Sequence, residues 1–180
     1  MTDRNKQIIA AATILFLTDG VGVSTANIAK AAGVSNGTLF NAFPTKQVLI
    51  DSIYRKAKTA MFAALPHSGD APFNRAHLYE NWQGYLAWSS VHPEDRQIMH
   101  LLLDAGLASA ETRAQVDADA SLYVSWIQDA FDHGVIRGPD AAYIGKLIFL
   151  HIDLAITEGL KGKNTDLAFD MLCNSIGLNQ

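Results

Sequence analysis

A short run of small polar residues near the amino terminus could form hydrogen bonds to the edges of nucleic-acid bases. These residues carry hydroxyl or amide groups or, in one case, no side chain: Ser35, Asn36, Gly37, Thr38 and Asn41. Hydroxyl and amide groups both donate to and accept from base edges, and a helix with a slim polar face fits the major groove of DNA, which is about 12 Å wide. Val34, Leu39 and Phe43 alternate with them and are expected to face inward. The pattern therefore predicts a helix that reads DNA.

Three short helices must position this segment. Ser24 or Thr25 can cap a second helix that Gly33 ends, and Ser35 can cap a third helix that ends before Pro44. Two helices joined by a tight turn containing glycine are typical of a helix-turn-helix motif. The free amides at the amino end of the second helix would approach phosphate groups.

A first helix is predicted to end near Asp19 and Gly20. Its apolar residues follow the helical spacing of three and four positions and are expected to form the inner face: Ile8, Ala11, Ala12, Leu15 and Phe16. Lys6, Thr13 and Asp19 fall outside this face and are expected to point away from the core.

The rest of the chain also reads as helical. Proline and glycine separate six further segments, at about 46–65, 75–91, 94–107, 109–134, 140–161 and 165–177. Strands would show alternating apolar residues between hairpin turns, and the sequence contains no such pattern. We therefore predict an all-α fold of about nine helices.

Composition and charge narrow the class of protein. The chain has 180 residues, of which 49% are hydrophobic and 18% charged, as in a folded soluble domain. Residues 1–58 hold seven Lys or Arg and three Asp, a net charge of +4, whereas residues 59–180 hold seven basic and fifteen acidic residues, a net charge of −8. Contact with a polyanion is thus expected at the amino-terminal end.

The sequence gives no sign of secretion or of a membrane span. The opening residues lack the apolar core of a signal peptide, and no stretch reaches about 18 consecutive apolar residues. Cys173 is the single cysteine, so one chain cannot form a disulfide or a cysteine-based metal site. We expect a cytoplasmic protein with no membrane partner, in which Cys173 is a small buried apolar residue.

The segment from Ile28 to Lys46, IAKAAGVSNGTLFNAFPTK, resembles the DNA-binding signature of TetR-family transcriptional regulators. The close resemblance covers about residues 8–50 and includes Gly20 after the first helix. It implies a helix-turn-helix DNA-binding domain over 1–47 and a helical effector-binding and dimerisation domain over 48–180. It further implies a homodimer that binds a palindromic double-stranded DNA operator, represses transcription and leaves the DNA when a small molecule binds.

The resemblance also implies roles for individual residues. Ser24, Thr25 and Ala26 match DNA contacts at the start of the second helix, the polar residues 35–38 and 41 match the recognition helix, and Lys46 matches a phosphate-binding lysine. Phe40 stands where the family usually has tyrosine, and Ala42 where it often has histidine or tyrosine. We therefore expect weak anchoring to phosphates, with Lys46, Lys6, Arg4 and backbone amides supplying more of it.

A group of large amphipathic residues lies between positions 82 and 126. We predict that they line a pocket for an apolar or aromatic effector, with His100 and Asp104 as its polar groups. The members are Trp82, Tyr85, Trp88, Met99, His100, Leu103, Asp104, Tyr123 and Trp126. For any single aromatic residue in this group, an ordinary place in the core is the alternative.

A catalytic or metal site has little support. His100 and Asp104 are four positions apart and could share a helix face, but two ligands do not make a metal site. His151 and Asp153 could join them only from another helix. The nucleophile elbow Gly-x-Ser-x-Gly and glycine-rich phosphate loops are missing from the sequence. We predict no metal, no cofactor and no enzymatic activity.

The last two predicted helices, 140–161 and 165–177, are apolar on more than one side. This predicts that they pack against a second copy of the chain as a two-fold four-helix interface, with an intramolecular core as the alternative. Three other functions stay open at this point: a small-molecule-binding protein that has lost operator binding, an all-α enzyme using His100 and Asp104, and a transcriptional activator.

Overall fold

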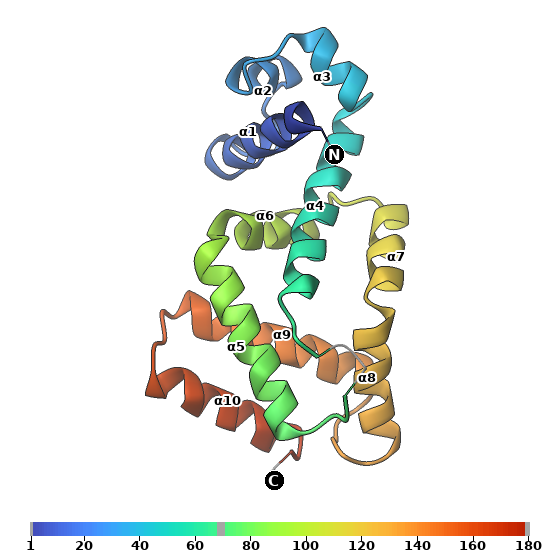
Figure 1. Ribbon diagram of the computed structural model, residues 1–180, viewed down its shortest axis with the longest axis vertical. Coiled ribbons are helices and arrows are strands. Elements are labelled where there is room, and N and C mark those ends of the chain that lie inside the picture. The colour runs from blue at the N-terminus through green and yellow to red at the C-terminus, as the bar shows by residue number, and fades with distance from the viewer. Residues whose placement is uncertain (1, 68–70, 179–180) are drawn as a thin grey trace. The chain divides into compact units, whose positions relative to one another are not determined.

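The computed structural model describes residues 2–67 and 71–178, which form ten α-helices and no strand (Figure 1). The helices are α1 (Asp3–Asp19), α2 (Thr25–Ala31), α3 (Asn36–Ala42), α4 (Lys46–Ala63), α5 (Arg75–Val91), α6 (Pro93–Asp104), α7 (Ala110–Asp119), α8 (Ser121–Asp132), α9 (Ala141–Thr157) and α10 (Lys163–Ser175). The predicted all-α class is confirmed.

The expected single helix over 109–134 is wrong, because the structure divides it into α7 and α8. Ala120 separates them with φ −88° and ψ 6°, which lies outside the helical region. The residue is alanine, a good helix former, so local propensity gives no warning of the break. This division accounts for ten helices where the sequence predicts about nine.

Capping residues mark the starts of α2 and α3 as predicted. The Ser24 hydroxyl accepts a hydrogen bond from the Asn27 amide at 3.2 Å, and the Ser35 hydroxyl accepts one from the Thr38 amide at 3.1 Å. Between them Gly33 has φ +67°, a left-handed conformation that favours glycine and turns the chain out of α2.

The chain divides into two units. The first contains residues 1–61 and 91–117, and in it α1 packs against α2 and α6 while α2 packs against α3. Its core contains Ile8, Phe16, Ile28, Leu39, Leu49, Ile53, Ile98 and Leu102. The expectation that Thr13 points away from the core is wrong, since its exposed fraction is 5%. Two neighbouring helices cover α1, which therefore buries a wider arc than one apolar face.

The second unit contains residues 62–90 and 118–180, in which α9 packs against both α8 and α10. Its core is rich in aromatic and β-branched side chains: Leu78, Trp82, Tyr85, Trp126, Ile144, Ile152, Phe169 and Leu172. Cys173 is fully buried here, as predicted. Across residues 2–67 and 71–178, every helix is too short or too polar to cross a bilayer.

Candidate nucleic-acid interface

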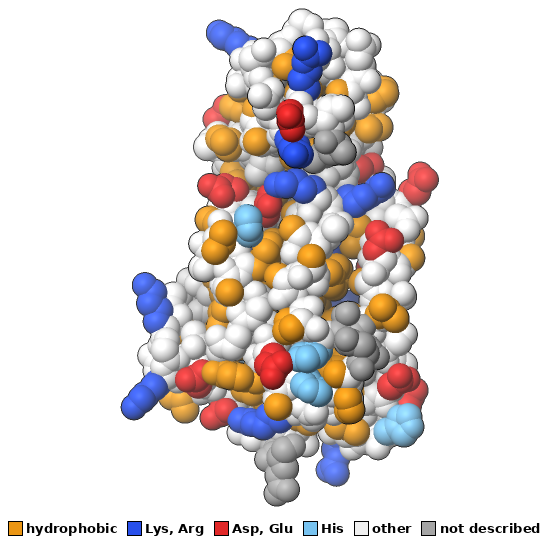
Figure 2. Space-filling view, viewed as in Figure 1, with side chains coloured by type: hydrophobic (Ala, Val, Ile, Leu, Met, Phe, Trp, Pro, Cys, Tyr) orange, Lys and Arg blue, Asp and Glu red, His pale blue; other side chains and the backbone are white. Residues whose placement is uncertain are grey.

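Helix α3 presents most of the predicted base-reading residues to solvent. Ser35, Asn36, Gly37 and Asn41 are exposed and Thr38 is half-buried. Apolar residues hold the helix from the other side, with Leu39 and Phe43 buried and Val34 half-buried. The structure thus brings these residues onto one short helix with a polar outer face, and in Figure 2 the surface over α2 and α3 is mostly uncharged.

Part of the hydrogen-bonding capacity of this face is used within the chain. The Ser35 hydroxyl lies 2.9 Å from the Thr38 hydroxyl and also caps α3. Asn36 and Asn41 are the two exposed residues of α3 that carry amide side chains. An amide group can form two hydrogen bonds to one adenine edge, so these two side chains have the chemistry that base reading requires.

The amino end of α2 carries the second predicted contact group. Ser24 and Ala26 are exposed and Thr25 is half-buried, so all three lie at the surface of the first unit. Ser24 and Ser35 each cap a helix, and both helix starts keep free amides beyond the capped one. Backbone amides at such positions attract phosphate oxygens.

Lys46, the expected phosphate ligand, has partners inside the first unit. Its ammonium donates a hydrogen bond to the Val23 carbonyl at 2.7 Å and lies 5.7 Å from the centroid of the Phe16 ring. The side chain is half-buried. Lys46 therefore connects the start of α4 with α1 and with the link between α1 and α2.

Other basic residues of the amino-terminal segment differ in their surroundings. Arg4, Lys6 and Lys30 are exposed, and Lys6 lies 3.5 Å from the Asp3 carboxylate. Lys56 is paired with Asp95 at 2.8 Å. Burial lowers the pKa of Lys58, against a smaller raising effect from the Asp117 carboxylate. Part of the positive charge counted in the sequence is thus neutralised or withdrawn from the surface.

The predicted effector residues fall into two groups. The five aromatic residues, Trp82, Tyr85, Trp88, Tyr123 and Trp126, are all buried in the second unit. Ring centroids are 5.5 Å apart for Tyr85 and Trp88 and 5.9 Å apart for Tyr123 and Trp126. The Phe149 ring joins the two pairs, with centroids 6.0 Å from Tyr85 and 5.7 Å from Tyr123, and Trp82 lines one cavity with both tyrosines. We call these five residues the aromatic cluster.

The other four predicted effector residues lie on α6 in the first unit. Met99 is buried, His100 is half-buried, and Leu103 and Asp104 are exposed. The α6 segment and the aromatic cluster therefore belong to different units, and the pocket that joins them stays a prediction.

Trp82, Tyr85 and Tyr123 line a small cavity of about 20 Å³ inside the second unit. Its other lining residues are Leu65, Leu78, Asn81, Ile148, Phe149 and Ile152, so its wall carries no charged side chain. Among the described residues the buried Trp82 indole nitrogen has no hydrogen-bond partner, whereas that of Trp126 donates to the Ala71 carbonyl at 2.6 Å. Burial raises the pKa of Tyr123, which keeps its hydroxyl neutral.

Sequence reasoning missed the part of this cavity wall that comes from α9. Ile148 and Ile152 are four positions apart, a spacing that does mark one helix face. The sequence predicts a dimer interface for the helix over 140–161 as a whole, because periodicity does not say which element a face meets.

A second, more open hollow of about 620 Å³ lies between α5 and α10 in the same unit. Arg75 and Asp170 form an ion pair at 2.5 Å on its wall, and the Tyr79 hydroxyl donates to Asp166 at 2.8 Å. This hydrogen bond is the main reason why the pKa of Tyr79 is raised. Arg75 is therefore paired with Asp170, and Asp166 is held by the Tyr79 hydroxyl.

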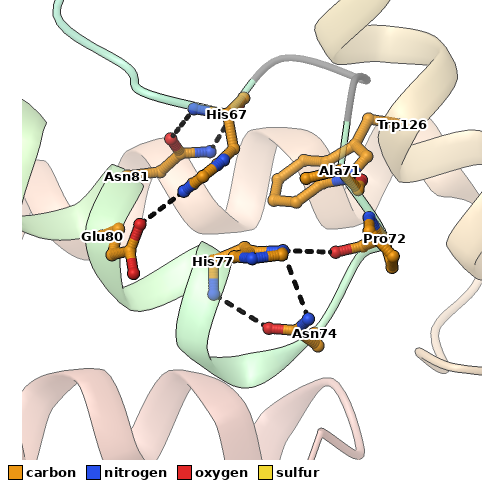
Figure 3. A network of polar contacts seen from close by, with 8 residues as sticks. All are labelled: His67, Ala71, Pro72, Asn74, His77, Glu80, Asn81 and Trp126. Atoms are coloured by element: carbon orange, nitrogen blue, oxygen red, sulfur yellow. Dashed lines mark hydrogen bonds and ion pairs between the residues drawn. The ribbon is translucent and has the colours of Figure 1, made fainter.

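Side-chain hydrogen bonds connect His67 and Asn74 with α5 (Figure 3). The Asn81 side chain accepts from the His67 amide at 2.9 Å and donates to the His67 carbonyl at 2.7 Å. The His67 ring contacts Glu80 and stacks on His77 with centroids 4.3 Å apart. The hydrogen bond from His67 is the main reason why the pKa of Glu80 is lowered.

In the part of the chain that the structure describes, no three acidic, His or Cys residues lie close enough together to hold a metal ion.

Comparison with known proteins agrees with the geometry of α1–α3. Residues 8–53 match the family described as bacterial regulatory proteins, tetR family. A tetR family transcription regulator from Shewanella sp. PV-4 is similar over 97% of this chain and 98% of its own, with a TM-score of 0.79 and 20% identity. A regulator of the same family from Marinobacter aquaeolei VT8 has a TM-score of 0.80 and 19% identity over 96% and 95% of the two chains.

The same fold occurs with another described role. The superantigen PfiT is similar over 96% of this chain and 95% of its own, with a TM-score of 0.69 and 19% identity. At these identities the similarity establishes the fold and does not assign a function.

Proposed function

Because this chain carries the amino-terminal domain of bacterial regulatory proteins of the TetR family on a TetR-like all-helical fold, we propose that it is a cytoplasmic, homodimeric transcriptional repressor rather than an enzyme. In this proposal two copies bind a palindromic DNA operator, and a small apolar or aromatic effector releases them. The exposed polar face of α3, held by buried Leu39 and Phe43, is the observation that carries the proposal.

DNA binding is assigned to two sets of residues. Asn36 and Asn41 read base edges from α3, supported by the smaller residues on the same helix. Phosphates are met at the starts of α2 and α3 and by the nearby cations. The full proposed interface is Ser24, Thr25, Ala26, Ser35, Asn36, Gly37, Thr38 and Asn41, and Lys46 lies at its edge, at the start of α4.

An apolar stripe on α9 and α10 supports the homodimer. Five large side chains have exposed fractions between 53% and 67%: Tyr143, Leu150, Leu154, Leu167 and Met171. Positions 143, 150 and 154 on α9, and 167 and 171 on α10, recur at helical spacing, so each helix carries one continuous apolar edge. Burying the stripe against its copy removes this surface from water and gives a closed two-fold dimer.

Release by an effector requires that the ligand bind the DNA-incompetent conformation more tightly than the DNA-bound one. The aromatic cluster is the proposed binding region, because its cavity wall is uncharged and the Trp82 indole nitrogen needs an acceptor. A drug-sized ligand needs about 300–1,000 Å³, so the cavity must enlarge when it binds.

Selection of random duplexes by the purified protein tests the proposal. Enrichment of a palindrome with half-sites about 34–36 Å apart is expected, as two recognition helices require. Asn36→Ala should relax the preference at one base pair per half-site at a cost of about 1–3 kcal/mol, while Asn164→Ala on the second unit should leave the consensus unchanged. If no sequence is enriched even at low salt, the repressor assignment is wrong.

Phe40 favours a second candidate, a small-molecule-binding protein that no longer binds an operator. Its exposed fraction is 42%, so an apolar ring stands on the surface of the recognition helix where the family usually places a phenol. The selection experiment separates the two candidates. Calorimetric binding of apolar aromatic compounds by a protein that enriches no duplex would support the second.

A further inference from the structure

The side chain of Lys46 reaches back across the first unit to the link between α1 and α2. Its ammonium donates to the Val23 carbonyl at 2.7 Å, although the two residues are 23 positions apart in the chain. A hydrogen bond from a charged donor is roughly twice as strong as one between neutral groups. This bond therefore fixes the position of the Val23 peptide relative to the start of α4.

A second partner holds the same ammonium from α1. The nitrogen lies 5.7 Å from the centroid of the Phe16 ring, within the range of a cation–π contact, and Phe16 is fully buried. A lysine used purely as a surface charge would stay fully hydrated. Lys46 is half-buried and has committed one of its three donors, so its geometry is that of an internal tie.

The residue that Lys46 holds is next to the cap of α2. Val23 precedes Ser24, whose hydroxyl caps the helix through the Asn27 amide at 3.2 Å. The Val23 amide is itself bonded to the Gly20 carbonyl at 3.2 Å, which closes the turn after α1. Helix α2, which starts after Ser24, packs against α3. The position of this turn therefore influences the position of α3, the proposed recognition helix.

We infer that Lys46 is a positioning residue for the DNA-binding helices, acting through the Val23 carbonyl to hold the turn that starts α2. This role does not need contact between the ammonium and a phosphate. As far as DNA is concerned it rests on the proposed function, but the positioning itself can be measured in the free protein.

Amide hydrogen exchange of the full-length protein tests the positioning without DNA. Lys46→Met should speed exchange of the hydrogen-bonded amides of Val23, Asn27 and Ile28 by about tenfold relative to those of α10, because a charge-assisted hydrogen bond and its local order are lost. Lys46→Arg, which keeps a charged donor, should retain most of the protection. Lys30→Met removes the same charge from an exposed site on α2 and should change the exchange much less.

Unchanged exchange in Lys46→Met, or equal acceleration in Lys30→Met, would overturn the inference. Global destabilisation is recognised by faster exchange in α10 as well. If Lys46→Met does not fold, Lys46→Gln takes its place, since its shorter amide side chain cannot span the distance to Val23. Unchanged exchange in Lys46→Gln, or equal acceleration in Lys30→Met, would then overturn the inference.

Salt dependence of binding to the selected operator gives an independent readout. Loss of a phosphate contact lowers the slope of log affinity against log salt by about 0.9, whereas loss of positioning weakens binding with the slope unchanged. We expect Lys46→Met to weaken binding about tenfold at constant slope, with recovery in Lys46→Arg. If Lys46→Met lowers the salt slope and leaves the amide exchange unchanged, Lys46 is a phosphate ligand and the positioning role is wrong. If no duplex is enriched, the proposed function fails and the exchange experiment still decides.

Discussion

The side-chain carboxylate of Asp51 on α4 accepts a hydrogen bond of 2.8 Å from the backbone amide of Ser109, just before α7. The Ser109 hydroxyl in turn accepts from the Thr112 amide at 3.1 Å and caps α7. One turn earlier on α4, the Gln47 amide group donates to the Leu107 carbonyl at 2.9 Å. Two side chains of α4 thus hold the loop between α6 and α7 within the first unit.

Removing this carboxylate should destabilise the first unit. Asp51→Ala leaves the Ser109 amide without its partner, and we expect the free energy of unfolding to fall by about 1–3 kcal/mol. Asp51→Asn keeps an acceptor of the same shape and should lose less. Urea denaturation gives the values, with Glu158→Ala at an exposed site as the control. Equal stability of Asp51→Ala and the natural protein would mean that the bond contributes nothing.

Gly84 is required by a close approach in the second unit. A Cβ atom at this position of α5 would lie 2.3 Å from the Ala64 carbonyl oxygen and 3.1 Å from Pro66 Cδ. Alanine is the better helix former by about 1 kcal/mol, but the clash involves backbone, so we expect Gly84→Ala to lower the free energy of unfolding by about 1–3 kcal/mol.

Gly145 on α9 is the matched control for this substitution. Its added Cβ would lie 3.5 Å from Ile127 Cδ1, an ordinary contact distance. Gly145→Ala should therefore be neutral or stabilise by up to about 1 kcal/mol. The denaturation midpoints of the two variants are compared. If both midpoints shift in the same direction and by the same amount, the approach of α5 to Ala64 is not tight.

Cys173 should be unreactive in the folded protein. Burial is the main cause that raises the pKa of its thiol to about 11, and the reactive species is the thiolate. At pH 8 the thiolate fraction is then on the order of one in a thousand, so labelling by a disulfide reagent should be at least about a hundredfold slower than for an unfolded chain. The measurement is the labelling rate with and without 8 M urea; similar rates would contradict the burial of this side chain.

The amino-terminal helices could be predicted from the sequence because their signals are local. Ser24, Gly33 and Ser35 act on amides within a few positions, so spacing alone places α2, the turn and α3. The expectation that Thr13 points away from the core is wrong, because spacing within α1 does not show that a second helix covers the other side of α1. Only the packing against α2 and α6 reveals this.

Pairing between distant elements could not be predicted in the same way. Trp82 and Tyr123 line a cavity together with residues of α9, whereas His100 lies in the other unit. All three lie in segments with helical spacing, so spacing does not show which of them meet. The contact of Lys46 with Val23 depends on the fold of three helices, so the resemblance supplied a role for the lysine without its internal partner. Residue type predicted the chemistry of these positions, and tertiary packing decided which of them meet.

The departures at Phe40 and Ala42 lead to a prediction on the strength of DNA binding. Phe40 has an exposed fraction of 42%, so a hydroxyl added in Phe40→Tyr would stand at the surface of α3, where it could donate to a phosphate. Ala42 is half-buried, so a histidine there needs room that alanine does not. We expect the double variant Phe40→Tyr with Ala42→His to bind the selected operator about tenfold more tightly, mostly through Phe40→Tyr.

Fluorescence anisotropy with labelled operator measures this gain. Phe40→Leu, which replaces the ring with another apolar side chain and adds no hydroxyl, is the control and should not tighten binding. The gain from Phe40→Tyr should also be present on an unrelated duplex at low salt, because a phosphate contact carries no sequence information. Unchanged affinity in the double variant, with the fold intact, would show that the two side chains do not limit anchoring and that other groups of α1–α4 already saturate the phosphate contacts.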